Sequence, residues 1–282
     1  MFRKFIMTMG LLFASLAVSA GEPIKFMYVG VPQVGGGVIF AQSYAKNLQG
    51  VDSKFVSLKD CDLAMKEVAD SDDVIFLVAS TNTITSMKHN VECVPKFKPE
   101  DILVTTITYF DYCQKAGNKL DLFKQRINIG AASIVPMDGM AKDLNAQNAT
   151  RWVSVGYPAS QLVATAVING DIDLGFLTHS VAAPMIANKQ LECPYTTNPK
   201  APNYMAKSFR QVSSDFEMDY ILAIKSKDPK VRKAAVEAAQ SAGFQEWLKS
   251  SGFDAYKTSG FEQKDIDRWN KLNNDTFNNF MK

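Results

Sequence analysis

The residues best suited to bind a ligand lie in five short turns, each between an expected strand and the helix that follows it. These turns are rich in Gly, Ser, Thr and Asn and contain no Lys or Arg; they span residues 31–37, 80–83, 131–138, 156–160 and 178–181. In open α/β sheets, ligands bind outside the carboxyl ends of the strands, where such turns gather. Backbone N–H groups at helix N-termini can hold an anion without a cationic side chain. The turns are therefore either ordinary connections or the parts of a site for a small carboxylate.

Three consecutive glycines, Gly35, Gly36 and Gly37, open one of the expected helices. Their spacing fits neither G-x-x-x-x-G-K-[ST] nor G-x-G-x-x-G, so it does not support a nucleotide site. Glycines at a helix start instead permit close approach between the backbone and a ligand.

An enzymatic interpretation has few residues to use. The chain has two histidines, and Ser133, Asp138 and His179 can be written as a hydrolytic triad. The sequence has no G-x-S-x-G elbow, no H-E-x-x-H pair and no C-x-x-C pair, so hydrolase and zinc motifs are missing. We therefore expect no enzyme, no cofactor and no metal site.

The elements that must position the turns form two α/β series. Short β-rich runs alternate with helical stretches, which predicts an α/β protein with largely parallel sheets. The expected strands are 24–30, 54–58, 74–79 and 102–109 in the first series, and 127–131, 152–155 and 171–177 in the second. A β-rich run at 219–225 then leads into a long helix over 228–249, and 261–281 forms a last helix.

The first twenty residues have the three parts of a secretory signal peptide. Arg3 and Lys4 precede an apolar run over 5–18, and small residues end at Ala20. The alternative, a membrane anchor, would need about 20 apolar residues. Loss of two of the 31 basic residues would leave 29 of each sign, and a balanced charge gives no general attraction to nucleic acid or anionic membranes.

Four cysteines, Cys61, Cys93, Cys113 and Cys193, are an even number in an exported chain. They are either disulfide-bonded or free buried thiols, and four cysteines allow three pairings.

Several segments together resemble the substrate-binding proteins of tripartite tricarboxylate transporters, the TctC or Bug family, over essentially the whole mature chain. The turn at 31–37 is similar to the family's Pro-x-Gly-Gly turn, the strand at 74–81 ends in small hydroxyl residues, and 129–133 is similar to its second-lobe Gly-Ser turn. The segments 155–157 and 168–173 look like the family's Val-Pro-Tyr strand end and its Gly-x-Val-Asp junction, and 183–186 and 244–262 also match. The chain departs from the family at 38–39 and 135–137.

The resemblance implies a two-lobed periplasmic-binding-protein (Venus-flytrap) fold with a mixed, mostly parallel sheet in each lobe. Lobe 1 would comprise residues 21–108 and 226–282, and lobe 2 residues 109–225. It implies a monomeric periplasmic receptor, cleaved after Ala20, that delivers a di- or tricarboxylate or a related organic acid to a tripartite membrane permease. Nucleic acid is not an expected partner.

The same resemblance assigns residues to the site and pairs the cysteines. The implied pairs are Cys61 with Cys93 and Cys113 with Cys193, each within one lobe. The implied ligand-binding residues are Gln33, Gly36, Gly37, Ser80 and Thr81 in lobe 1, and Ala132, Ser133, Tyr157, Ser160, Thr178 and His179 in lobe 2. Two alternatives stay open: a binding protein for another transporter or sensor, and, less favoured, an exported hydrolase that uses Ser133 and His179.

Overall fold

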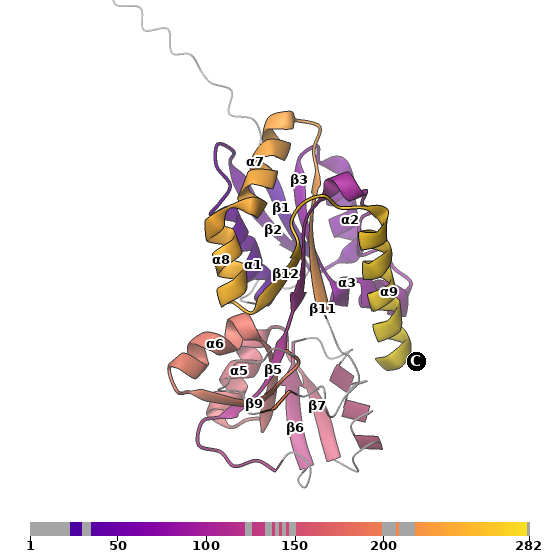
Figure 1. Cartoon of the computed structure of the whole chain (residues 1–282). Helices are drawn as coiled ribbons and strands as arrows, with labels where there is room; N and C mark the ends of the chain where they lie inside the picture. Colours follow the sequence, from indigo (N-terminus) through magenta and orange to yellow (C-terminus); the bar gives the residue numbers. More distant parts are fainter. Residues whose placement is uncertain are drawn as a thin grey trace, which may run out of the picture.

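Two six-stranded sheets, each covered by helices, form the two lobes of the molecule (Figure 1). The computed structural model describes residues 23–29, 35–121, 126–132, 137–138, 141–142, 145–146, 151–198, 207–208 and 218–280. Within these residues, no helix is both long enough and apolar enough to cross a membrane.

The first sheet has the strand order β12-β4-β11-β3-β1-β2. Strands β1, β2 and β3 are parallel, whereas β11 is antiparallel to β3 and β4, and β12 is antiparallel to β4. The strands are β1 Ile24–Val29, β2 Ser53–Leu58, β3 Val74–Ala79, β4 Ile102–Thr108, β11 Met218–Lys225 and β12 Phe253–Lys257. The sheet is therefore mixed, and parallel pairs occur only among the first three strands.

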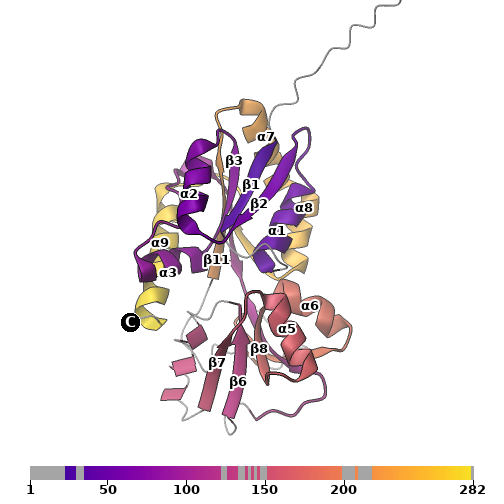
Figure 2. The same ribbon diagram turned by 180° about the vertical axis from the view of Figure 1, so that it is seen from behind.

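Helices cover both faces of this sheet, because the buried side chains of its strands alternate between two apolar clusters. On β1, Ile24 and Phe26 pack in one cluster, and Met27 and Val29 in the other. This alternation is the period of two expected of a strand buried on both faces. Helices α1, α7 and α8 lie on one face, and α2, α3 and α9 on the other (Figure 2). Their bounds are α1 Gly36–Ala45, α2 Cys61–Asp70, α3 Ser80–His89, α7 Pro229–Gln240, α8 Ala242–Ser250 and α9 Gln263–Phe280, with a 3-10 turn at Pro99–Asp101.

The second sheet has the strand order β10-β9-β5-β8-β6-β7. Strand β6 is parallel to β7 and β8, and β5 is antiparallel to β8 and β9. Residues of α5 and α6 form one apolar cluster with this sheet. The elements are β5 Phe110–Lys115, β6 Arg126–Ala131, β7 Arg151–Gly156, α5 Ser160–Asn169, β8 Leu174–Thr178, α6 His179–Ala187, β9 Leu191–Thr196 and β10 Lys207–Ser208.

The chain passes from the first lobe to the second at Tyr109, which alone separates β4 from β5. Strand β11 lies between β3 and β4 in the first sheet, although the expected lobe 2 extended to residue 225. Residues 218–225 therefore pair within lobe 1. The reason is the strand's apolar character on both faces, which suits the middle of a sheet covered on two sides.

The expected single helix over 228–249 is two helices. Ser241 has an extended backbone, and its hydroxyl accepts a hydrogen bond from the Phe244 N–H at 3.2 Å. Serine favours this N-cap conformation. Ser241 is therefore the residue between the end of α7 and the start of α8.

Both expected disulfides are present. Cys61 bonds to Cys93 in the first lobe, and Cys113 bonds to Cys193 between β5 and β9 in the second. The pairing implied by the family resemblance is confirmed, and both bonds leave the two lobes unlinked.

Candidate functional site

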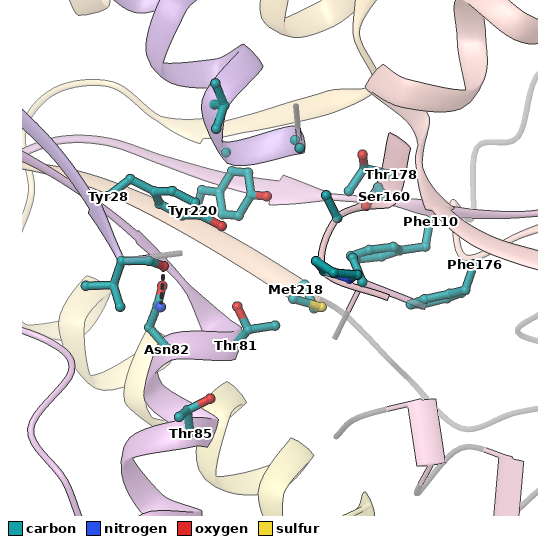
Figure 3. A pocket seen from close by; sticks show the side chains of 18 residues that line it. Tyr28, Thr81, Asn82, Thr85, Phe110, Ser160, Phe176, Thr178, Met218 and Tyr220 are labelled. Atoms are coloured by element: carbon teal, nitrogen blue, oxygen red, sulfur yellow. Dashed lines mark hydrogen bonds between the residues drawn. The ribbon is translucent and has the colours of Figure 1, made fainter. Parts of the chain in front are cut away.

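A cavity of about 240 Å³ lies between the two lobes, at the carboxyl ends of β1 and β8 (Figure 3). The described side chains that line it include no Lys, Arg or His. The lining residues are Tyr28, Val29, Gly35, Gly36, Gly37, Val38, Thr81, Asn82 and Thr85, together with Phe110, Ala132, Pro158, Ala159, Ser160, Phe176, Thr178, Met218 and Tyr220.

Three helices begin at this cavity. The side chains of their N-cap residues cannot accept hydrogen bonds from the backbone N–H groups at these helix starts. The N-cap residues of α1, α3 and α5 are Gly35, Ala79 and Ala159, which have no side-chain acceptor. By contrast, Asp60, Asp228 and Ser241 cap α2, α7 and α8 through side-chain oxygens. Free N–H groups at a helix start attract anions through their partial positive charge. The uncapped ends therefore supply the positive potential of a cavity that lacks cations in its described wall.

The start of α1 comes close to its neighbours because it consists of glycines. A Cβ atom on Gly37 would lie 2.6 Å from Cζ of Tyr28, closer than real contacts allow. A Cβ on Gly36 would lie 3.1 Å from the Thr178 side chain, which belongs to the other lobe. The glycines thus allow the helix end to sit against both walls of the cavity.

Asn82 fixes the position of α3 relative to strands β1 and β3. Its Oδ1 accepts a hydrogen bond from the Ala79 N–H at 2.9 Å, and its Nδ2 donates to the Val29 carbonyl at 3.0 Å. The ends of β1 and β3 are therefore held together beside the cavity.

Two tyrosines point their hydroxyls into the cavity from β1 and β11 (Figure 3). Burial raises the pKa of Tyr28 to about 12. Burial and the neighbouring Tyr28 raise the pKa of Tyr220 well above its usual range. The Tyr220 side chain is 5% exposed, and its hydroxyl bonds to none of the residues that the structure describes. Both groups are therefore neutral hydrogen-bond donors at physiological pH.

The opposite part of the wall combines apolar side chains with the hydroxyls of Ser160 and Thr178, which lie beside Phe110 (Figure 3). The rings of Phe110 and Phe176 are stacked, with centroids 4.3 Å apart and planes inclined by 6°. Met218 lies beside them, and Figure 3 shows all three on the side away from Tyr28.

The structure brings together many of the residues that the sequence assigned to the site. The expected residues that line the cavity are Gly36, Gly37, Thr81, Ala132, Ser160 and Thr178. Three others do not line it: Ser80, Tyr157 and His179. The Ser80 hydroxyl is used within lobe 1, where it bonds to the backbone N–H and carbonyl of Asp219. Gln33 and Ser133 lie outside the described residues.

The aromatic lining residues were missed, because turn composition says nothing of side chains inside strands. A usable signal was the period of two along a strand. Phe176 precedes the expected Thr178 by two residues on β8, so both face the cavity. Met218 and Tyr220 are also two residues apart on β11, but neither was an expected site residue, so this signal could not have found them.

His179 belongs to the contact between the lobes. Its Nδ1 lies 2.7 Å from Oδ2 of the buried Asp111, and its backbone N–H donates to the Tyr109 carbonyl at 3.2 Å. A Cβ on Gly252, from lobe 1, would lie 2.5 Å from Cδ2 of the histidine ring. Burial alone would lower the pKa of His179, but the hydrogen bond and charge of Asp111 outweigh it and raise the pKa.

The hydrolytic triad written from the sequence is not assembled. Asp138 accepts a hydrogen bond from the Ser154 hydroxyl at 2.7 Å and pairs with Lys142 at 3.1 Å, so it does not orient His179. Among the described residues, no group of three or more His, Cys, Asp or Glu side chains could hold a metal ion.

Several solved structures share this fold. The periplasmic binding protein BugD has 13% sequence identity and a TM-score of 0.71, over 90% of this chain and 95% of BugD. MatC (Rpa3494) from Rhodopseudomonas palustris, solved with bound malate, has 13% identity and a TM-score of 0.62, over 89% of this chain and 98% of MatC. Rpa4515 from R. palustris, solved with adipate, has 11% identity and a TM-score of 0.70, over 91% and 96% of the two chains.

These likenesses define the class of fold. The chain has the two-lobed α/β fold of Bug- and TctC-type periplasmic solute-binding proteins, so the resemblance drawn from the sequence is confirmed for the fold. No protein-family model matches the sequence, and no curated protein matches it significantly.

Replacement of Gly37 tests the close approach of α1. Gly37→Ala should destabilise the fold by about 1 to 3 kcal/mol, the usual cost of overpacking, because the new methyl group meets the Tyr28 ring. Gly243→Ala is the matched control, since Gly243 is also the second residue of its helix but faces only the flexible Asn47 amide at 3.0 Å. Chemical denaturation measures both; equal stability of the two variants would contradict the packing described.

Replacement of His179 tests its ion pair with Asp111, which lies within lobe 2 beside the contact with lobe 1. Because the pKa of His179 is raised in the folded chain, the pair stabilises the fold fully below the unfolded value of about 6.5. This stabilisation is lost as the pH rises through the folded pKa. The free energy of unfolding should therefore fall more on His179→Gln at pH 5.5 than at pH 8.5.

The exposed His89 provides the control, as His89→Gln changes a histidine outside this contact. A stability difference for His179→Gln that is flat across this pH range, or that grows with rising pH, would show that the pair with Asp111 does not form as described.

Proposed function

We propose that the protein is a periplasmic solute-binding receptor that captures a small carboxylate between its lobes and delivers it to a tripartite tricarboxylate-type permease. The signal peptide would be cleaved after Ala20, and the mature monomer would diffuse between the ligand and the membrane. The solved structures with malate and adipate support a carboxylate as the ligand of this fold.

One observation carries the proposal: the uncapped N-termini of α1, α3 and α5 meet at a cavity with no cation in its described wall. Such ends stabilise an anion by about 0.3 to 1 kcal/mol each through the dipole, and by up to about 2 kcal/mol when partly buried. Several helix N-termini together can bind a carboxylate and still release it.

The unpartnered hydroxyls add specific hydrogen bonds. Tyr220 and Ser160 are each 5% exposed and line the cavity, and the hydroxyl group of neither bonds to a described residue. Neither oxygen is among the buried side-chain atoms that lack a partner, so both hydroxyls are accessible from the cavity. A bound carboxylate or ordered water would supply the missing acceptor.

Movement of the lobes would provide capture and release. The described connection between the lobes is the single residue Tyr109, and both disulfides lie within one lobe. Short connections between rigid lobes suit hinge closure around a ligand.

Thermal denaturation of the mature chain with a ligand panel tests this function. At a ligand concentration of 100 times Kd, binding adds about 2.7 kcal/mol to stability. At least one carboxylate among di- and tricarboxylates, aromatic acids and acidic amino acids should therefore raise the Tm by several degrees. If sugars or cations raise the Tm and no carboxylate does, the proposal is wrong.

Tyr220→Phe separates binding from folding in the same assay. Loss of a hydrogen bond to a charged group costs about 1.5 to 3 kcal/mol, so affinity should fall roughly 10- to 100-fold. Tyr256→Phe, on a tyrosine that is 47% exposed, is the matched control. Unchanged affinity in Tyr220→Phe would remove this hydroxyl from the site.

A further inference from the structure

The start of α6 in lobe 2 packs directly against two glycines of lobe 1. Thr178 meets Gly36, and His179 meets Gly252. We propose that this contact is a stop, which sets the angle at which the two lobes close and with it the width of the interlobe cavity. The stop consists of protein atoms alone, so the inference goes beyond the receptor function proposed above and does not depend on it.

The stop lies beside the point where the chain crosses between the lobes. In lobe 1, Gly252 comes directly before β12, whose first residue pairs with the last residue of β4. In lobe 2, His179 comes directly after β8, whose last residue pairs with the first residue of β5. Tyr109 joins β4 to β5, so Gly252 and His179 lie on the two sides of this connection.

The contact at Gly252 leaves no room for a side chain. A Cβ on Gly252 would lie 2.5 Å from Cδ2 of His179 and 2.8 Å from both Cβ and Cγ of the same residue. Real Cβ contacts are essentially never shorter than 3.0 Å. Because the Cβ of His179 is one of the atoms in contact, a change of ring rotamer cannot make room. A larger residue at position 252 therefore requires the two backbones to move apart.

The lobe 1 side of the stop is the end of a helix that is anchored in the core. Gly252 follows α8, and its N–H donates to the Lys249 carbonyl at 3.4 Å. Its φ of +74° lies in the left-handed region, which favours glycine. Phe244 and Leu248 of α8 are fully buried. We therefore expect this segment to hold its position when lobe 2 presses on it.

The lobe 2 side of the stop is fixed by bonds within that lobe and at the crossing. Nδ1 of His179 lies 2.7 Å from Oδ2 of Asp111, which is fully buried. The His179 N–H donates to the Tyr109 carbonyl at 3.2 Å. A side chain that is held in advance loses little entropy when it makes a contact. His179 therefore presents a rigid surface to Gly252.

The contact between the lobes continues along α1. A Cβ on Gly36 would lie 3.1 Å from Cγ2 and Oγ1 of Thr178, and Ile39 packs against an apolar cluster of lobe 2 that contains Val181. Figures 1 and 2 show α6 facing α1 and α8 across this boundary. Because the stop lies beside the crossing, a small separation there turns the lobes and moves their far edges further apart.

Electron spin resonance between one spin label in each lobe measures the interlobe distance and tests the stop. All four cysteines are in disulfides, so cysteines introduced at exposed residues can be labelled selectively. Suitable exposed residues are Glu237 of α7 and Thr165 of α5, on the side where α6 meets α8 (Figure 1). In the mature chain without added ligand, Gly252→Ala should lengthen the mean distance by several ångströms, because its methyl group forces the backbones apart.

Gly50→Ala is the matched control for backbone strain. Gly50 has a φ of +73°, almost the same as Gly252, but a Cβ there meets nothing within 4 Å. Both substitutions place alanine in a left-handed conformation, so both lose stability through the backbone. Only Gly252→Ala should change the interlobe distance, and Gly50→Ala should keep that of the parent chain.

Gly36→Val is a second wedge, in a helical backbone without this strain. It should also lengthen the interlobe distance, because even its Cβ comes within 3.1 Å of Thr178. Circular dichroism shows which variants fold, and Gly36→Val decides if Gly252→Ala does not fold.

An interlobe distance equal to that of the parent chain in folded Gly252→Ala would overturn the stop. So would an equal lengthening in Gly50→Ala, since the change would then come from backbone strain. The measurement contains no ligand, so a failure of the stop and a failure of the carboxylate function are separate results.

Discussion

A cavity proposed to hold an anion without a cationic side chain must bring backbone N–H groups within hydrogen-bond distance of it, and this constraint accounts for the residues at the helix starts around it. The glycines at the start of α1 allow the helix end to lie against Tyr28 and Thr178 without a Cβ in between. Ala79 and Ala159 leave the starts of α3 and α5 without a side-chain cap. Side chains that would stabilise the isolated helices are thus replaced by residues that leave their ends open to a ligand.

The beginning of α6 joins this cavity to the contact between the lobes. Thr178 lines the cavity, and the adjacent His179 packs against Gly252 of lobe 1 and pairs with Asp111. Tyr109 holds both sides, since its carbonyl accepts from the His179 N–H and its hydroxyl donates to Asp254 of lobe 1 at 2.8 Å. Any proposed movement of the lobes must therefore rearrange residues next to the cavity.

Much of the fold could be predicted from the sequence, because strand and helix periodicity and turn composition are local properties. Turn composition placed Gly36, Thr81 and Ser160 in candidate ligand-binding turns, the family resemblance assigned them to the site, and all three line the cavity. Tyr220 could not be found in this way, since it lies within a β-rich run that is typical of a core strand. Only the sheet order, which places β11 beside β3, brings its hydroxyl to the cavity. His179 was assigned to the ligand, but its ring is taken by the partner Asp111, which local sequence cannot reveal.

The central claim is that helix N-termini and neutral hydroxyls, rather than cationic side chains, hold the carboxylate between the lobes. A crystal structure of the mature chain with its tightest-binding carboxylate tests this claim most directly. The account predicts carboxylate oxygens about 2.7 to 3.2 Å from backbone nitrogens at the start of α1 or α5, with the Tyr220 hydroxyl as a further donor. A carboxylate paired with a Lys or Arg side chain, or bound outside the interlobe cavity, would contradict it.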